Sequence, residues 1–286
     1  MADPGTGRKP SDYRGQNKAT WCPGCGDYGV LTALYRAFAR HDLDPARLVI
    51  VSGIGCSGRL PEFVGSYGLH GVHGRVLPTA MGVKLANPEL TVIAVGGDGD
   101  GFAIGGGHVP HAVRRNVDIT YVVMDNNIYS LTKGQPSPTT PQGMEAVKVS
   151  PSLPKMAPGG VHELPLNPLA LVLAYGGSFV ARGFASQPQQ LSDLIAQGIA
   201  HRGFAFVHAL SPCVTYYDTR ELWRESVAPL AEEWDAGDRM RALQLALLAV
   251  PQPEVRPAYD EVVGSVHPVP EEERSQAFRT LLESFA

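Results

Sequence analysis

The sequence predicts an α/β fold, a mostly parallel sheet flanked by helices, with a C-terminal helical tail. Short apolar runs such as Leu48–Ser52 and Ile119–Met124 alternate with segments of helical spacing, which is the pattern of a parallel sheet. Several of these runs end in glycine-rich or polar turns. Because parallel strands end at one edge of their sheet, we expect these turns to lie together there.

The first half of the chain begins with a polar segment, residues 1–20, that we expect to form an extended arm. A helix is expected from about Tyr28 to Arg40, because its apolar residues are spaced for one buried face. The strand Leu48–Ser52 and a helix of small residues from Val76 to Lys84 follow. A third strand starts at Thr91, and a helix is expected directly after its glycine-rich end.

After the strand Ile119–Met124, residues 135–168 are rich in proline and have little periodicity, which indicates a long irregular loop. The α/β pattern then resumes with two helices and two strands. They are expected near Asn167–Tyr175, Phe179–Ala181, Pro188–His201 and Phe204–Leu210.

The C-terminal part of the chain differs in character from the preceding α/β pattern. Asp235–Val250 and Pro270–Phe285 have helical spacing on either side of a proline-rich linker. We therefore interpret residues 21–217 as one domain and residues 218–286 as a tail that wraps this domain or a neighbour.

Composition excludes several classes of protein. The chain has 286 residues and a net charge of -4, so nothing favours a nucleic-acid partner. No apolar run reaches the length of a membrane span, and the N-terminus lacks the apolar core of a signal peptide. We therefore expect a cytoplasmic protein without a membrane partner. Its four cysteines would be reduced there, as free thiols or metal ligands.

Oxygen ligands follow two neighbouring strands. Asp98 and Asp100 lie in the turn after the strand that begins at Thr91, and Asn126 and Asn127 follow the next strand. Carboxylate and amide oxygens suit a hard cation that also keeps phosphate oxygens in its shell. Mg²⁺ with a diphosphate is the expected occupant.

The cysteines allow three interpretations. Cys22 and Cys25 form a C-x2-C turn, Cys56 lies in a glycine turn after a strand, and Cys213 follows another strand. A thioredoxin-like redox pair needs no further cysteines. A zinc ribbon usually has a second close C-x2-C or a histidine pair, which this chain lacks. An iron–sulfur cluster needs four thiolates and tolerates distant ligands, so it is slightly favoured over zinc.

Several motifs carry a resemblance to a known family. The GDG turn followed by the later NN resembles the thiamine diphosphate motif, and WCPGCGD, GIGCSGRLPEF and HGR precede it. In this order, the motifs resemble the β subunit of 2-oxoacid:ferredoxin oxidoreductases over about Trp21 to Tyr217. The resemblance implies the thiamine diphosphate-binding fold, of the diphosphate-binding type. It also implies an oxidoreductase.

The resemblance implies the ligands as well. Side-chain oxygens of Asp98 and Asn126 and the carbonyl of Ile128 would hold Mg²⁺, and Cys22, Cys25, Cys56 and Cys213 would bind one [4Fe-4S] cluster. The cofactor-binding residues expected around thiamine diphosphate are Ile54, Gly55, Cys56, Ser57, His73, Gly97, Asp98, Gly99, Asp100, Asn126, Ile128, Tyr129, Ser130, Leu131 and Thr132.

Three residues are expected to have roles in catalysis, at the cofactor or at the substrate. His73, in HGR, would approach the cofactor as a hydrogen-bond donor, while Leu131 would shape the substrate pocket. Arg59 would meet the distal carboxylate of a dicarboxylic oxoacid, a task suited to a forked donor, and so favours 2-oxoglutarate. The expected reaction is oxidative decarboxylation of 2-oxoglutarate with coenzyme A to succinyl-CoA and CO2, or the reverse carboxylation.

The alternatives are pyruvate, a branched-chain or an aryl oxoacid, a non-redox thiamine diphosphate enzyme with structural zinc, and a metal-bound scaffold.

A second subunit is also expected. Thiamine diphosphate enzymes take a glutamate from a pyrimidine-binding domain, and none of Glu62, Glu89 and Glu145 matches such a position. The resemblance therefore implies an α subunit that carries this glutamate and most coenzyme A contacts. We expect a heterodimer, doubled into a heterotetramer, with ferredoxin as electron acceptor.

Overall fold

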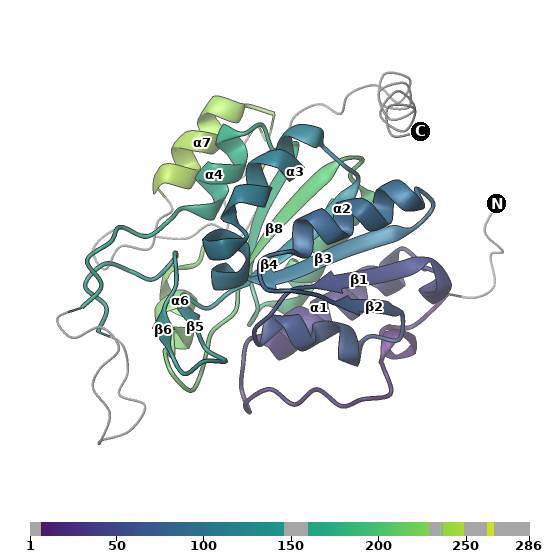
Figure 1. Cartoon of the computed structure of the whole chain (residues 1–286), viewed down its shortest axis with the longest axis horizontal. Helices are drawn as coiled ribbons and strands as arrows, with labels where there is room; N and C mark the ends of the chain where they lie inside the picture. The colour runs from purple at the N-terminus through teal and green to yellow at the C-terminus, as the bar shows by residue number, and fades with distance from the viewer. Residues whose placement is uncertain (1–6, 146–159, 229–234, 236, 249–261, 266–286) are drawn as a thin grey trace.

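The computed structural model describes residues 7–145, 160–228, 235, 237–248 and 262–265 (Figure 1). Its main sheet has seven strands in the order β2-β1-β3-β4-β8-β7-β9. All neighbours pair in parallel except β7 and β9, which are antiparallel. The strands are β1 (Leu48–Ser52), β2 (Tyr67–His70), β3 (Thr91–Gly97), β4 (Ile119–Asp125), β7 (Phe179–Phe184), β8 (Phe204–Leu210) and β9 (Val262–Ser265).

Helices cover both faces of the sheet (Figure 1). The helices α1 (Asp27–Arg40) and α5 (Pro188–Ala200) pack on one face, where Ile50 and Ile93 point. The opposite face is covered by α2 (Val76–Ala86), α3 (Val109–Arg115), α4 (Pro168–Ala174) and α7 (Arg239–Leu248). Since the central strands are apolar on both sides, they are buried in both directions, as in other parallel sheets.

Short elements surround the sheet. The 3-10 helices are η1 (Pro10–Tyr13), η2 (Pro45–Arg47), η3 (Ser57–Phe63) and η5 (Gly106–His108), and η4 (Gly99–Ile104) is a π-helical turn. A two-stranded hairpin joins β5 (Ile128–Tyr129) to β6 (Gln135–Pro136), and α6 (Arg220–Ser226) follows the last parallel strand.

The predicted fold class is confirmed, and the expected helices and strands of residues 28–210 occur within a few residues of their predicted bounds. The helix after the third strand differs. The chain first forms the π-helical turn, closed by the N–H of Gly105 donating to the carbonyl of Asp100 at 3.2 Å, and α3 begins only at Val109. Such π turns are frequent at functional sites.

The sequence did not predict β2, the β5–β6 hairpin, α6, β9 or the short 3-10 helices. Within the predicted tail, α7 packs on α4, and β9 extends the sheet beside β7. The second predicted tail helix, Pro270–Phe285, lies outside the described residues. Among the described residues, no helix is long and apolar enough to cross a membrane.

Candidate active site at the carboxyl edge of the sheet

A cavity of about 200 Å³ opens at the carboxyl edge of the sheet. All of the residues that the sequence assigned to cofactor binding line it, from Ile54 to Thr132. Asp27 and Met124 line it as well, although sequence reasoning did not select them. The lining comes from the ends of β1, β3 and β4 and from the hairpin that follows β4.

Asp98 follows β3 and Asp125 is the last residue of β4, and the two lie at neighbouring strand ends because Gly97 of β3 pairs with Met124 of β4. Both carboxylates are buried, with 2% and 1% of their surfaces exposed. Burial, and then the charge of Asp125, raise the pKa of Asp98 well above its usual value. Thus no positive group among the described residues compensates the ionised form of Asp98.

An unusual backbone conformation in the turn after β4 orients the oxygen atoms of this turn. Asn127 has a left-handed φ of 61°, and its buried side chain fixes the turn. The side-chain oxygen of Asn126 accepts the N–H of Ile128 at 3.1 Å, so amide and backbone group lie side by side. Asn126 and Ile128 both line the cavity together with Asp98.

Asp100 connects three loops at the rim of the sheet. Its Oδ1 accepts the N–H groups of Ile54 and Gly74, at 2.9 and 2.8 Å. The Nδ1 atom of His73 lies 3.0 Å from the same oxygen, without hydrogen-bond geometry, and its ring is 6.2 Å from that of Tyr129. Asp100 therefore joins the loops of Ile54 and Gly74, and His73 lies beside its carboxylate in the cavity lining.

Cys56 lines the cavity, and Cys22, Cys25 and Cys213 lie within electrostatic reach of it. The N–H of Gly26 donates to the carbonyl of Pro212 at 3.0 Å, which joins the C-x2-C turn to the loop of Cys213. The indole N–H of Trp21 donates to the carbonyl of Cys56 at 2.8 Å. All four thiols are free. Among the described residues, no three His, Cys, Asp or Glu side chains are close enough to hold one metal ion.

Burial raises the pKa of the Cys25 thiol and raises that of Cys56 to about 12, and the carboxylate of Asp27 adds to both. The remaining contributions include Cys213 in both cases, so the thiols lie within electrostatic reach of one another. Thiolates at these positions require a nearby positive charge.

Asp27 is the main site residue that sequence reasoning missed. Its Oδ1 accepts the hydroxyl of Ser211 at 2.6 Å, whereas its buried Oδ2 has no hydrogen-bond partner among the described residues. Burial raises its pKa to about 6. Its place directly after the C-x2-C turn was the available signal.

Two of the three residues expected to have roles in catalysis line the cavity, and one does not. His73 and Leu131 are in the lining, and Leu131 is 55% exposed at the rim. Arg59 is not among the lining residues. Its guanidinium pairs with Glu62 at 3.1 Å and lies over the ring of Phe63, 5.7 Å from the ring centre.

Comparison with known proteins identifies the family. Residues 53–209 match the model of the thiamine pyrophosphate enzyme, C-terminal TPP binding domain. The chain is 47% identical over 205 residues to subunit beta of a 2-oxoacid:ferredoxin oxidoreductase 2 of Aeropyrum pernix, covering 72% of this chain and 64% of that relative. The chain belongs to the β subunits of 2-oxoacid:ferredoxin oxidoreductases.

Two further relatives of this β subunit carry 2-oxoglutarate in their names. A 2-oxoglutarate synthase subunit KorB of Methanothermobacter marburgensis is 42% identical over 207 residues, covering 72% of this chain and 70% of that relative. A solved structure is described as 2-oxoglutarate:ferredoxin oxidoreductase from Magnetococcus marinus with 2-oxoglutarate, coenzyme A and succinyl-CoA bound. It is 41% identical, has a TM-score of 0.87, and the match covers 96% of this chain and 91% of that one.

Proposed function

We propose that this β subunit, with an α subunit, catalyses the oxidative decarboxylation of 2-oxoglutarate with coenzyme A and passes the electrons to ferredoxin. The position of Cys56 carries the proposal, because this residue lines the cavity and also belongs to the group of four thiols. An electron acceptor held by these thiols would adjoin a cofactor bound in the cavity. The names of two relatives contain 2-oxoglutarate, which supports this compound as the substrate.

Thiamine diphosphate with Mg²⁺ fits the cavity. Asp98, Asn126 and the carbonyl of Ile128 offer oxygen donors of the kind that Mg²⁺ prefers. The raised pKa of Asp98 supports the assignment, because a cation beside this carboxylate would supply the missing positive charge. Bound thiamine diphosphate supplies the carbanion chemistry of 2-oxoacid decarboxylation. Within the chain, His73 would donate a hydrogen bond at the cavity wall.

A [4Fe-4S] cluster fits the four thiols better than zinc does. A tetrahedral zinc site requires all of its ligands around one ion, and no such group occurs among the described residues. A cluster separates its ligands over several ångströms, and its irons would stabilise thiolates whose pKa is raised by burial. It accepts electrons one at a time. Cys22, Cys25, Cys56 and Cys213 would be its ligands.

A second subunit is needed to complete the site. Two apolar side chains of the cavity lining, Ile54 and Leu131, are 39% and 55% exposed. Exposed apolar surface around a binding site favours a protein partner. No glutamate lines the cavity in the described part of the chain, so the glutamate that acts on the aminopyrimidine would come from the α subunit. We propose a heterotetramer of two α and two β subunits.

Arg59 is proposed to select the dicarboxylic substrate. Its guanidinium already binds a carboxylate, that of Glu62, in a half-exposed pair of small energetic value. The distal carboxylate of 2-oxoglutarate can therefore compete for the same forked donor. Leu131, at the rim, would contact the aliphatic part of the substrate.

Anaerobic purification of the chain with its α subunit tests the proposal. We expect about four irons and four acid-labile sulfides per β subunit, bound thiamine diphosphate, and a higher rate with 2-oxoglutarate than with pyruvate. EPR during turnover should show a reduced cluster. Zinc in place of iron, or 2-oxoacid oxidation by the β subunit alone, would refute the proposal.

A further inference from the structure

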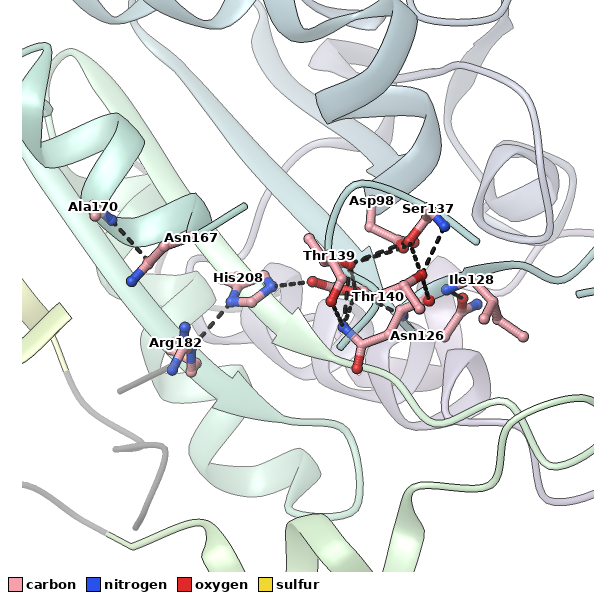
Figure 2. Close-up of polar contacts among 12 residues, drawn as sticks. Asp98, Asn126, Ile128, Ser137, Thr139, Thr140, Asn167, Ala170, Arg182 and His208 are labelled. Atoms are coloured by element: carbon pink, nitrogen blue, oxygen red, sulfur yellow. Dashed lines mark hydrogen bonds and ion pairs between the residues drawn. The ribbon is translucent and has the colours of Figure 1, made fainter. Parts of the chain in front are cut away.

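A chain of buried polar contacts lies behind Asp98, outside the cavity lining (Figure 2). It runs from Arg182 through His208 and Asp125 to Thr139, and from Thr139 to Asp98. The exposed surface of each of these residues is 5% or less. Buried polar groups in this number are costly unless each has a hydrogen-bond partner, so every contact in the chain matters for stability.

The sheet register brings three of these side chains to one face. Arg182 of β7 is the direct partner of His208 on β8. His208 is also paired with Val123 of β4, so Asp125 lies two residues further along β4 and points to the same side. Neighbouring strands thus align a guanidinium, an imidazole and a carboxylate in one row.

The donors in this row fix the tautomer of His208. Arg182 can only donate, and its Nε lies 3.1 Å from Nδ1 of His208, so Nδ1 accepts. The proton of the neutral ring is therefore on Nε2, which donates to Oδ2 of Asp125 at 2.8 Å. Oδ1 of Asp125 accepts the backbone and side-chain N–H groups of Asn127 at 2.8 and 3.1 Å. Asp125 is therefore satisfied without a hydroxyl donor.

The hydroxyl of Thr139 lies between two carboxylates and has one proton to donate. It is 2.9 Å from Oδ1 of Asp125 and 3.0 Å from Oδ2 of Asp98. Because His208 and Asn127 already satisfy Asp125, the proton of Thr139 goes to Asp98. The hydroxyl of Ser137 donates to the same Oδ2 at 2.5 Å.

We propose that Thr139 and Ser137 are positioning residues of the cation site, and that His208 acts through Asp125 to keep Thr139 directed at Asp98. Two donors on Oδ2 fix the carboxylate rotamer and assign Oδ1 to the cation. Partners of this kind around a metal ligand typically change metal affinity 10- to 100-fold when removed. The inference rests on the proposed Mg²⁺ and thiamine diphosphate site, and it assigns roles to residues outside that site.

Mn²⁺ binding to the assembled α–β complex in the presence of thiamine diphosphate tests the proposal. The EPR signal of free Mn²⁺ measures the bound fraction directly, without an activity assay. We expect Thr139→Val, which keeps the side-chain shape, to weaken Mn²⁺ binding about 10-fold, and Thr139→Ser, which keeps the hydroxyl, to restore it. The matched control is Thr120→Val, because Thr120 is a buried threonine like Thr139 but lies on β4, at the end of the strand away from Asp125.

A loss of less than fivefold in Thr139→Val, or a loss that Thr139→Ser does not recover, overturns the proposal. If Thr139→Val does not fold, Ser137→Ala decides by the same fivefold limit, since its hydroxyl donates to the same oxygen. His208→Leu should also weaken Mn²⁺ binding, and combining it with Thr139→Val should add little, because both act on one contact. Additive losses refute the role of His208.

The wild-type complex separates the two possible failures. If it binds no Mn²⁺ with thiamine diphosphate, the proposed cofactor site is wrong. If it binds Mn²⁺ and the variants bind equally well, only the positioning role is wrong.

Discussion

Replacing Asp100 by alanine is expected to open the rim of the cavity. The carboxylate is buried, and its Oδ1 accepts the N–H groups of Ile54 and Gly74 at 2.9 and 2.8 Å. These amides belong to different loops, one after β1 and one before α2. A Cβ on Gly53 would lie 2.2 Å from the other carboxylate oxygen, so only glycine permits this approach.

The expected loss of local stability follows from these two hydrogen bonds. A hydrogen bond to a charged group contributes about 1.5–3 kcal/mol, so losing both costs about 3–6 kcal/mol. Part of this is recovered, because Oδ2 of Asp100 is buried without a hydrogen-bond partner among the described residues. We expect a net loss of about 3 kcal/mol of local stability for Asp100→Ala, and about half of that for Asp100→Asn, which keeps an acceptor.

Hydrogen exchange measured by mass spectrometry on the assembled complex is the suitable assay. Since 1.4 kcal/mol corresponds to a tenfold change, protection around Ile54 and Gly74 should fall about 100-fold in Asp100→Ala. Asp118→Ala is the matched control, because its carboxylate is half exposed and pairs with Lys84 at the surface. Unchanged exchange at both loops in Asp100→Ala would refute the reasoning.

The remaining predictions concern the cofactor, the cluster and the substrate. Burial, together with the neighbouring carboxylate of Asp125, raises the pKa of Asp98, so binding of Mg²⁺ with thiamine diphosphate should displace a proton from it. The affinity for Mg²⁺ should therefore fall as pH decreases, and a calorimetric binding enthalpy that does not depend on the buffer would contradict this. A Cβ on Gly99 would lie 2.2 Å from the ring of Tyr129, so Gly99→Ala should displace the ring and lower the affinity for thiamine diphosphate roughly tenfold. Fluorescence titration measures this affinity, and an unchanged value would contradict the prediction. Asp27→Asn removes a buried negative charge beside the cysteines and should raise the cluster midpoint potential by on the order of 50 mV in EPR-monitored titrations; a lowered potential would oppose this. Arg59→Ala should raise KM for 2-oxoglutarate roughly tenfold or more with little change for pyruvate, and an equal change for both substrates would remove its carboxylate assignment.

The sequence predicted the parts of the site that adjoin apolar strands. Asp98 and Asn126 could be placed together, because each follows a continuous apolar run and parallel strands end at one edge. The edge strand β2 escaped prediction for the opposite reason. All four of its residues are exposed, so its sequence has no apolar pattern to detect.

The loop of Ser137 and Thr139 could not be placed from sequence. It reaches Asp98 through the β5–β6 hairpin, whose strands have two residues each and whose turn contains left-handed Lys133 and Gly134. Such short strands leave no periodicity. A signal for the rest of the buried row did exist, since Arg182 and His208 each interrupt an otherwise apolar strand, and polar residues at such positions need partners.

The different roles of the two buried carboxylates follow from strand order. Asp125 ends β4, which borders β8, and β8 brings His208 against it. Burial alone would raise the pKa of Asp125, but the hydrogen bonds from His208 and from the N–H of Asn127 lower it. Asp98 directly follows β3, whose neighbours are β1 and β4, and the titratable group at the adjacent end of β4 is Asp125 itself. Asp98 and Asp125 could exchange their surroundings only if the strands of the sheet had a different order. The position of β3 in the sheet therefore leaves one buried carboxylate in need of a cation, at the edge where the cavity opens.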